Sequence, residues 1–261
     1  MLILNEEQYA ANLYIGKNDQ VNSVVGKIGY ITRYHLYTLG LSDEDNYKFT
    51  VEWMNRNHDN FDESYYSNFV SDAIKRAHKM PFYLVDNIKI TQSELQSISS
   101  LDNLRAEKVL FVLLCMAKQQ RVVSGFTNGL VRYSLTDLCK LARISVPADD
   151  REYILYNILQ KGLLGCPKKN DTKCLIVNCI NDDDEAALEL DEVDCQELAY
   201  VYLNWKNDGK GYTRCQRCNK LIKQSKTRPR KYCDECAEVV VTEQKRAWAE
   251  KNRKNLTQQN D

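Results

Sequence analysis

Four cysteines near the C-terminus, Cys215 and Cys218 followed by Cys233 and Cys236, form two Cys-x-x-Cys pairs. Each pair can turn two sulfurs toward one point, and two pairs complete the tetrahedral four-sulfur shell that zinc prefers in structural sites. Because protein fills every coordination position, such a site is architectural and leaves no open position for catalysis. The pattern predicts a structural Zn2+ ion. Iron or an iron–sulfur cluster is the alternative occupant of the same four thiolates.

The residues between and after the cysteine pairs indicate a short hairpin followed by a helix. Leu221 and Ile222 predict a short strand that leads into a basic turn. From Asp234 to about Asn255 the sequence contains no Pro or Gly, and the acidic residues at its start suit a helix N-terminus. A knuckle, a hairpin and a helix that supplies the last two ligands resemble a treble-clef or zinc-ribbon module.

Charge is balanced over the whole chain but not within its parts. The 261 residues include 36 Lys and Arg and 36 Asp and Glu, whereas residues 201–261 include 15 basic and 7 acidic residues, a net charge of +8. Residues 1–200 therefore carry a net charge of −8. A basic module attached to an acidic body favours binding to nucleic acid or another polyanion. The alternative is that these cations only keep a small zinc domain soluble.

Cations around the cysteines and in a second basic stretch are the candidate contacts to phosphate groups. In and after the cysteine motif they are Arg214, Arg217, Lys223, Lys226, Arg228, Arg230, Lys231, Lys245 and Arg246. The second stretch contributes Lys168, Lys169 and Lys173. The predicted partner is DNA or RNA.

The sequence predicts a cytoplasmic protein with no membrane partner. Its start, Met-Leu-Ile-Leu-Asn-Glu-Glu-Gln, lacks the basic residues, extended apolar run and small-residue cleavage site of a signal peptide. The longest apolar run, residues 109–117, is too short to cross a bilayer. Cysteines are therefore expected to be reduced. Those outside the motif occupy apolar positions that predict buried thiols: Cys115, Cys139, Cys166, Cys174, Cys179 and Cys195.

No second metal site and no catalytic site is predicted. Cys174 and Cys179 would lie on opposite faces of a strand, so they cannot share an ion. No two of the three histidines, His35, His58 and His78, have ligand spacing on a helix face, and they are expected to be isolated surface or interface residues. The sequence has no Walker loop, dinucleotide glycine fingerprint, His-Glu-x-x-His motif or nucleophile with a recognisable base. We therefore expect a protein that is not an enzyme.

Residues 1–100 predict an N-terminal helical region rich in Tyr. Ser42-Asp-Glu-Asp45 is a capping pattern for a helix that carries Phe49 and Trp53 on one face, and a second amphipathic helix follows over residues 66–77. The run Tyr37–His78 resembles the small helical module at the C-terminus of some phage and plasmid primases. That resemblance implies a replication setting and carries over no catalytic residue.

Residues 101–181 predict a middle domain. A helix with a wide apolar face over residues 106–117 is expected to be buried at its centre. Two further helices follow, the first capped by Ser134-Leu-Thr-Asp137 and the second ending at Gly162. Two strands joined by a polar turn then span residues 163–180. This order resembles a winged-helix domain.

In the winged-helix family the second helix of the pair enters the major groove and the hairpin, or wing, touches the backbone. Here that helix begins Asp149-Asp150-Arg151-Glu152, and its carboxylates would repel phosphates, whereas the lysines of the wing would not. Two interpretations stay open: the domain contacts DNA, or it serves as a protein-interaction or dimerisation surface.

Residues 182–206 predict an acidic connector followed by a helix or strand. Residues 181–197 contain no Lys or Arg. The segment is interpreted as a solvated linker or strand edge. The alternative is that it folds back on the basic tail and competes with nucleic acid, which would make binding steeply salt-dependent.

The sequence as a whole predicts a mainly α protein with a winged-helix-like α+β middle domain and a small C-terminal zinc module over residues 207–261. This arrangement, and above all its closing cysteine motif, resembles a group of largely uncharacterised proteins of phages and mobile elements in Gram-positive bacteria. The resemblance implies a small zinc protein acting on DNA or on a host machine. We expect a nucleic-acid-binding accessory protein in replication or transcription. The alternative is a protein-binding adaptor or inhibitor of a host machine, in which zinc only stabilises the fold.

Overall fold

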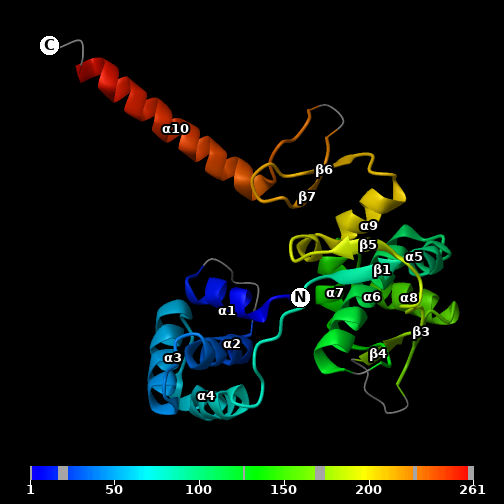
Figure 1. The fold of residues 1–261 in the computed structure, drawn as a ribbon, viewed down its shortest axis with the longest axis horizontal. Coiled ribbons are helices and arrows are strands. Elements are labelled where there is room, and N and C mark those ends of the chain that lie inside the picture. Colours follow the sequence, from blue (N-terminus) through cyan, green and yellow to red (C-terminus); the bar gives the residue numbers. More distant parts are fainter. Residues whose placement is uncertain (1, 17–22, 126, 168–173, 226–227, 258–261) are drawn as a thin grey trace. The chain divides into compact units, whose positions relative to one another are not determined.

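The computed structural model of the chain describes residues 2–16, 23–125, 127–167, 174–225 and 228–257 (Figure 1). Over these described ranges the chain is mainly helical, as predicted, and contains three small sheets. The first elements are α1 (Glu6–Tyr14), α2 (Val24–Tyr37), α3 (Asp43–Asn57), α4 (Glu63–Ala77), β1 (Ile88–Thr91), α5 (Gln92–Ser99) and α6 (Leu104–Ser124). They are followed by β2 (Leu130–Arg132), α7 (Leu135–Leu141), α8 (Ala148–Gln160), β3 (Leu164–Gly165) and β4 (Cys174–Val177). The last are β5 (Ala186–Leu190), the 3-10 turn η1 (Asp194–Gln196), α9 (Leu198–Lys206), β6 (Tyr212–Arg214), β7 (Leu221–Lys223) and α10 (Asp234–Thr257).

The chain divides into two compact units. Unit 1 consists of residues 1–88 and 118–127, and unit 2 of residues 89–117 and 128–261. Unit 2 begins after Ile88, so α5 and all of β1 except Ile88 belong to unit 2. The predicted N-terminal helical region, residues 1–100, had included both elements. The last turns of α6, from residue 118 onward, belong to unit 1.

Helices α1 to α4 form the body of unit 1 (Figure 1). Ser42 and Asp62 cap α3 and α4 by accepting hydrogen bonds from backbone N–H groups in the first turn, as the predicted start of α3 requires. The core contains Trp53 and Met54 from α3, but Phe49 is 41% exposed and lies outside it. Burial of one apolar stripe from each helix therefore fixes the bundle.

A buried polar network joins α2 to α3. His35 Nδ1 lies 3.0 Å from Thr50 Oγ1, which in turn donates to Asn46 Oδ1. Asn46 Nδ2 donates to the carbonyl of Thr32 at 2.9 Å. His35 is only 1% exposed and lies in this network, so the expectation of an isolated surface or interface histidine was wrong for this residue. The reason is that tertiary packing supplies polar partners that its sequence neighbours do not show.

An ion pair anchors α1 to α2. Both terminal nitrogens of Arg33 donate to the Glu6 carboxylate, at 2.7 and 3.1 Å, and the two side chains are 14% and 7% exposed. The guanidinium carbon also lies 4.9 Å from the ring centroids of Tyr30 and Phe82. Arg33 therefore satisfies a carboxylate that packing has removed from water.

Helix α6 forms the centre of unit 2. Every residue from Val109 to Cys115 is at most 2% exposed, which confirms the predicted buried helix. Glu107 is 1% exposed, accepts a hydrogen bond from Tyr202 Oη at 2.9 Å and pairs with Lys206. Helix α9 is therefore held against α6 by a satisfied buried carboxylate.

A three-stranded antiparallel sheet follows α6, in the order β2–β4–β3. The predicted hairpin of β3 and β4 is present, and β4 also pairs with β2, a strand that was not predicted, with Val131 opposite Leu175. Gly129 precedes β2 with φ +61°, and a Cβ atom there would lie 2.6 Å from the Val177 carbonyl oxygen. Only glycine allows the backbone to approach this closely.

The acidic segment after β4 contains a strand, which agrees with the strand-edge interpretation and not with a solvated linker. Strand β5 pairs with β1, and Glu189 forms an ion pair with Lys89 at 3.6 Å. Of the cysteines predicted to be buried, Cys115, Cys139, Cys174 and Cys195 are buried and Cys179 is half-buried. Cys166 is exposed because it follows the two-residue strand β3, where packing ends.

Replacing Arg33 with Met should lower the free energy of unfolding by about 3 kcal/mol, because Glu6 would stay buried without its partner. Urea-induced unfolding measures this change. The matched control is Arg56→Met, which removes an exposed Arg56–Glu52 pair on α3 and should cost at most about 0.5 kcal/mol. Equal effects of the two substitutions would contradict the assignment of Arg33 to a buried ion pair.

Burial of His35 lowers its pKa from the ordinary value of 6.5, so the folded chain keeps this ring neutral while the unfolded chain takes up a proton. Because the unfolded state binds more protons, the free energy of unfolding should fall as the pH drops below about 6.5. Urea unfolding at a series of pH values measures the slope. His35→Gln should flatten it, whereas the exposed-site control His78→Gln should retain it.

Candidate metal centre

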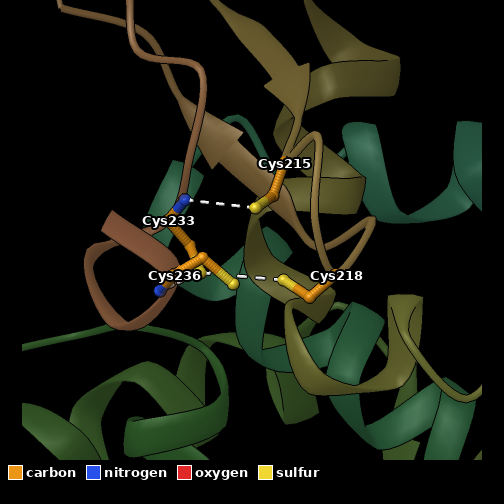
Figure 2. Close-up of side chains that lie close together, drawn as sticks. All are labelled: Cys215, Cys218, Cys233 and Cys236. Atoms are coloured by element: carbon orange, nitrogen blue, oxygen red, sulfur yellow. Dashed lines mark hydrogen bonds between the residues drawn. The ribbon is translucent and has the colours of Figure 1, made fainter. Parts of the chain in front are cut away.

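The four motif cysteines converge on one point. Figure 2 shows Cys215 and Cys218, from the β6–β7 hairpin, facing Cys233 and Cys236 from the start of α10. The four Sγ atoms all lie within 4.8 Å of one another, and the Cys218 and Cys233 sulfurs are 3.6 Å apart. Four sulfurs bound to one zinc at about 2.3 Å would be about 3.8 Å apart. The cluster can therefore hold a metal ion with only small movements of the side chains.

The first pair is shaped by a tight turn between β6 and β7. The two strands are antiparallel, with Arg214 opposite Leu221. Cys215 N donates to the Lys220 carbonyl at 2.9 Å, and Asn219 N donates to the Cys215 carbonyl at 3.0 Å. Asn219 has φ +61°, a left-handed conformation that Asn adopts more readily than most residues. This turn directs both sulfurs of the pair to the same side.

The second pair is placed by the N-terminus of α10. Cys233 directly precedes the helix and Cys236 lies in its first turn. Gln216 N donates to the Lys231 carbonyl at 3.0 Å, which ties the chain entering the helix to the first knuckle. Cys233 N donates to Cys215 Sγ at 3.3 Å, and Cys236 N donates to Cys233 Sγ at 3.5 Å. Backbone donors thus point at sulfur, which favours the thiolate form that metals bind.

The electrostatics of the cluster fit a cation. Burial raises the pKa of Cys215, but hydrogen bonds from the backbone N–H groups of Cys218, Cys233 and Arg217 outweigh it and lower this pKa to about 6. Burial, and then the neighbouring thiols, raise the pKa of Cys236. Four thiolates this close repel one another, and a divalent cation removes that repulsion.

Very little apolar packing supports this module. Its buried cluster consists of Cys215, Ile222 and Cys233, with Tyr232 partly buried beside them. So small a core does not stabilise a fold of this length, and a metal bound by the four cysteines would supply the missing stabilisation. Within the described part of the chain, no other group of His, Cys, Asp or Glu side chains converges in this way.

Three of the predicted phosphate-binding arginines, each partly exposed, form ion pairs with carboxylates of the same chain. Arg214 pairs with Asp194 at 2.9 Å, and Arg217 makes two hydrogen bonds to Glu243 at 2.8 and 2.9 Å. Arg230 pairs with Asp234 in the first turn of α10. These three ion pairs orient the hairpin and helix, and the prediction that the arginines contact phosphate stays a prediction.

The other predicted cations divide into described and undescribed residues. Five are exposed and form no ion pair within the described ranges: Lys223, Arg228, Lys231, Lys245 and Arg246. The remaining four, Lys168, Lys169, Lys173 and Lys226, lie outside the described residues.

Residues that sequence reasoning missed attach the module to η1 and α9, and attach the start of α9 to the segment after α7. Asp194, which is 7% exposed at its side chain, receives Arg214, and the Tyr200 and Tyr212 ring centroids are 5.6 Å apart. Glu197 binds Arg143, whose guanidinium carbon lies 4.3 Å from the centroid of the Tyr200 ring. Nothing in the sequence distinguishes Asp194 and Glu197 from the other carboxylates of the acidic segment.

Comparison with protein-family models, curated proteins and solved structures finds no match. None of the helices in the described ranges combines the length and the apolar character needed to cross a membrane.

Replacing Cys233 with Ser should abolish stoichiometric metal binding, because three thiolates no longer close the tetrahedral shell. Elemental analysis of protein purified without chelator should fall from about one zinc per chain to a small fraction of that value. The control is Cys166→Ser, an exposed thiol outside the cluster, which should leave the metal content unchanged. Full metal content in the Cys233 variant would contradict the four-thiolate site.

Proposed function

We propose that the four cysteines hold a structural Zn2+ ion. The closed set of four sulfurs, the backbone donors aimed at them and the small apolar cluster support this assignment. Zinc would fix the β6–β7 hairpin against the start of α10. Iron is the competing occupant, and elemental analysis distinguishes the two.

We further propose that the zinc module binds DNA or RNA through the phosphate backbone. The observation that carries this proposal is the set of five exposed cations that form no ion pair within the described ranges, in β7, between β7 and α10, and along α10. Arg214, Arg217 and Arg230 already form ion pairs with carboxylates. The proposed set of phosphate contacts is therefore smaller than the sequence indicates. Contacts of this kind give affinity without sequence readout and depend strongly on salt.

We propose that α6 to β4 form a winged-helix domain that does not read the major groove. The order helix, strand, two helices and two strands, with the sheet order β2–β4–β3, supports this fold. The first turn of α8 exposes Asp149 and Asp150, which would oppose phosphates. Phosphate contacts are therefore assigned to the zinc module, and α8 is assigned to protein contacts.

This combination suits a non-catalytic accessory protein in replication or transcription. The resemblance to phage and mobile-element proteins supports that setting, and a cytoplasmic location agrees with the expectation of reduced thiols. A protein-binding adaptor is the second candidate. The exposed tyrosines of α8 favour it, and they are considered in the next subsection.

Replacing both Arg228 and Lys231 with Ala should weaken the binding of full-length, zinc-loaded protein to random-sequence duplex DNA. If both residues meet phosphates, the slope of log affinity against log salt should become shallower by about 2. Fluorescence anisotropy over a salt series measures the affinity and the slope.

The matched control is the double substitution Lys75→Ala and Lys79→Ala, which removes the same charge from exposed positions at the end of α4 in unit 1. It should change neither quantity appreciably. If the two double variants bind alike, the β7–α10 segment is not the phosphate-binding surface.

A further inference from the structure

The outward face of α8 has an unusual composition for a helix exposed to water. Tyr153 and Tyr156 are 63% and 54% exposed, and their rings lie nearly parallel with centroids 6.5 Å apart. Asp149 and Glu152 are exposed beside them. These four residues are called the α8 face. Arg151, the only cation of the helix, donates to the Val146 carbonyl at 3.1 Å and is half-buried. The α8 face is therefore aromatic and acidic.

A groove lies next to this face. It has a volume of about 570 Å³ and is lined by Tyr156 and Glu152 of the α8 face, by Leu155 and Leu159 of α8, and by Leu135 at the start of α7. Leucine side chains form an apolar floor, and Glu152 supplies a negative charge at the rim. A groove of this kind suits a large apolar side chain flanked by cations.

The chain itself carries a surface of matching chemistry on α10. Val241 and Trp248 are 47% and 69% exposed, and Lys245 is exposed between them. The spacing of four and three residues places these three on one side of the helix. Arg246 is exposed next to them. These four residues are called the α10 face, and none of them forms an ion pair within the described ranges.

We infer that the α10 face of one copy docks on the α8 face of a second copy. Charge complementarity carries this assignment: Lys245 and Arg246 would meet Asp149 and Glu152, while Trp248 would enter the leucine-lined groove. Nucleic acid does not suit the α8 face, because its carboxylates repel phosphate. The same complementarity extends to the whole chain, since residues 1–200 and 201–261 carry net charges of −8 and +8.

Reciprocal docking gives a closed dimer. If each copy both donates its α10 face and accepts that of its partner, the two contacts are related by a two-fold axis and no further copies can add. The exposed tyrosines and tryptophan supply aromatic anchors of the type that dominates interface energy. The opposite charges of the two faces select each face as the partner of the other. Because salt screens these charges, the association is weaker at high salt.

Sedimentation velocity of the full-length, zinc-loaded protein, freed of nucleic acid, tests this inference over a range of concentration and salt. The wild type should form a dimer that dissociates on dilution and at high salt. Asp149→Lys with Glu152→Lys should weaken the dimer at least about tenfold, and so should Lys245→Glu with Arg246→Glu. Combining all four substitutions should restore most of the dimer, because the charges are exchanged and still complementary.

Asp183→Lys with Glu185→Lys is the control, because it makes the same change in charge at exposed positions between β4 and β5. It should leave the dimer intact. A wild type that stays monomeric at every concentration would overturn the inference, as would a dimer that survives either charge reversal. Weakening by both reversals without restoration in the combined variant would overturn the pairing of these two faces. The readout contains no nucleic acid, so these outcomes are independent of the proposed phosphate binding.

Discussion

The convergence of four thiols is the constraint on which the C-terminal part of the chain depends. The β6–β7 hairpin has only three residues in each strand, and its buried cluster has only three members. Such a segment cannot hold itself together by apolar burial. A cation that closed the sulfur shell would join the hairpin to α10. The cations proposed to contact phosphate in this region would then take their positions from the metal centre.

Carboxylates near the cysteines form ion pairs with some of the cations that were predicted to contact phosphate. Asp194, Asp234 and Glu243 each hold an arginine near the cysteines, and these pairs fix the hairpin to η1 and to α10. The cations left over lie on the β7–α10 segment and on the exposed side of α10. A count of basic residues cannot separate these two groups. The α8 face is acidic and the α10 face is basic, and this opposition is the basis of the proposal that two copies of the chain associate.

Features with a local cause could be predicted from the sequence. The cysteine spacing predicted the four thiols that converge in the structure, and capping residues such as Ser42 and Ser134 marked helix starts that the structure confirms. Features with a non-local cause could not. Strand β2 has three residues, too few for a periodic pattern, and β5 is a strand because β1 lies beside it. The burial of His35 depends on Thr50 and Asn46, which only the tertiary fold brings to it.

The most direct test of the account is the affinity of the full-length protein for random-sequence duplex DNA before and after removal of its metal. The account predicts binding that falls steeply with salt, disappears when a chelator extracts the zinc and returns when zinc is restored. Two results would contradict it. Binding that is unchanged after the metal is removed would show that the phosphate contacts do not depend on the metal centre. An absence of binding at low salt in the zinc-loaded protein would show that nucleic acid is not its partner.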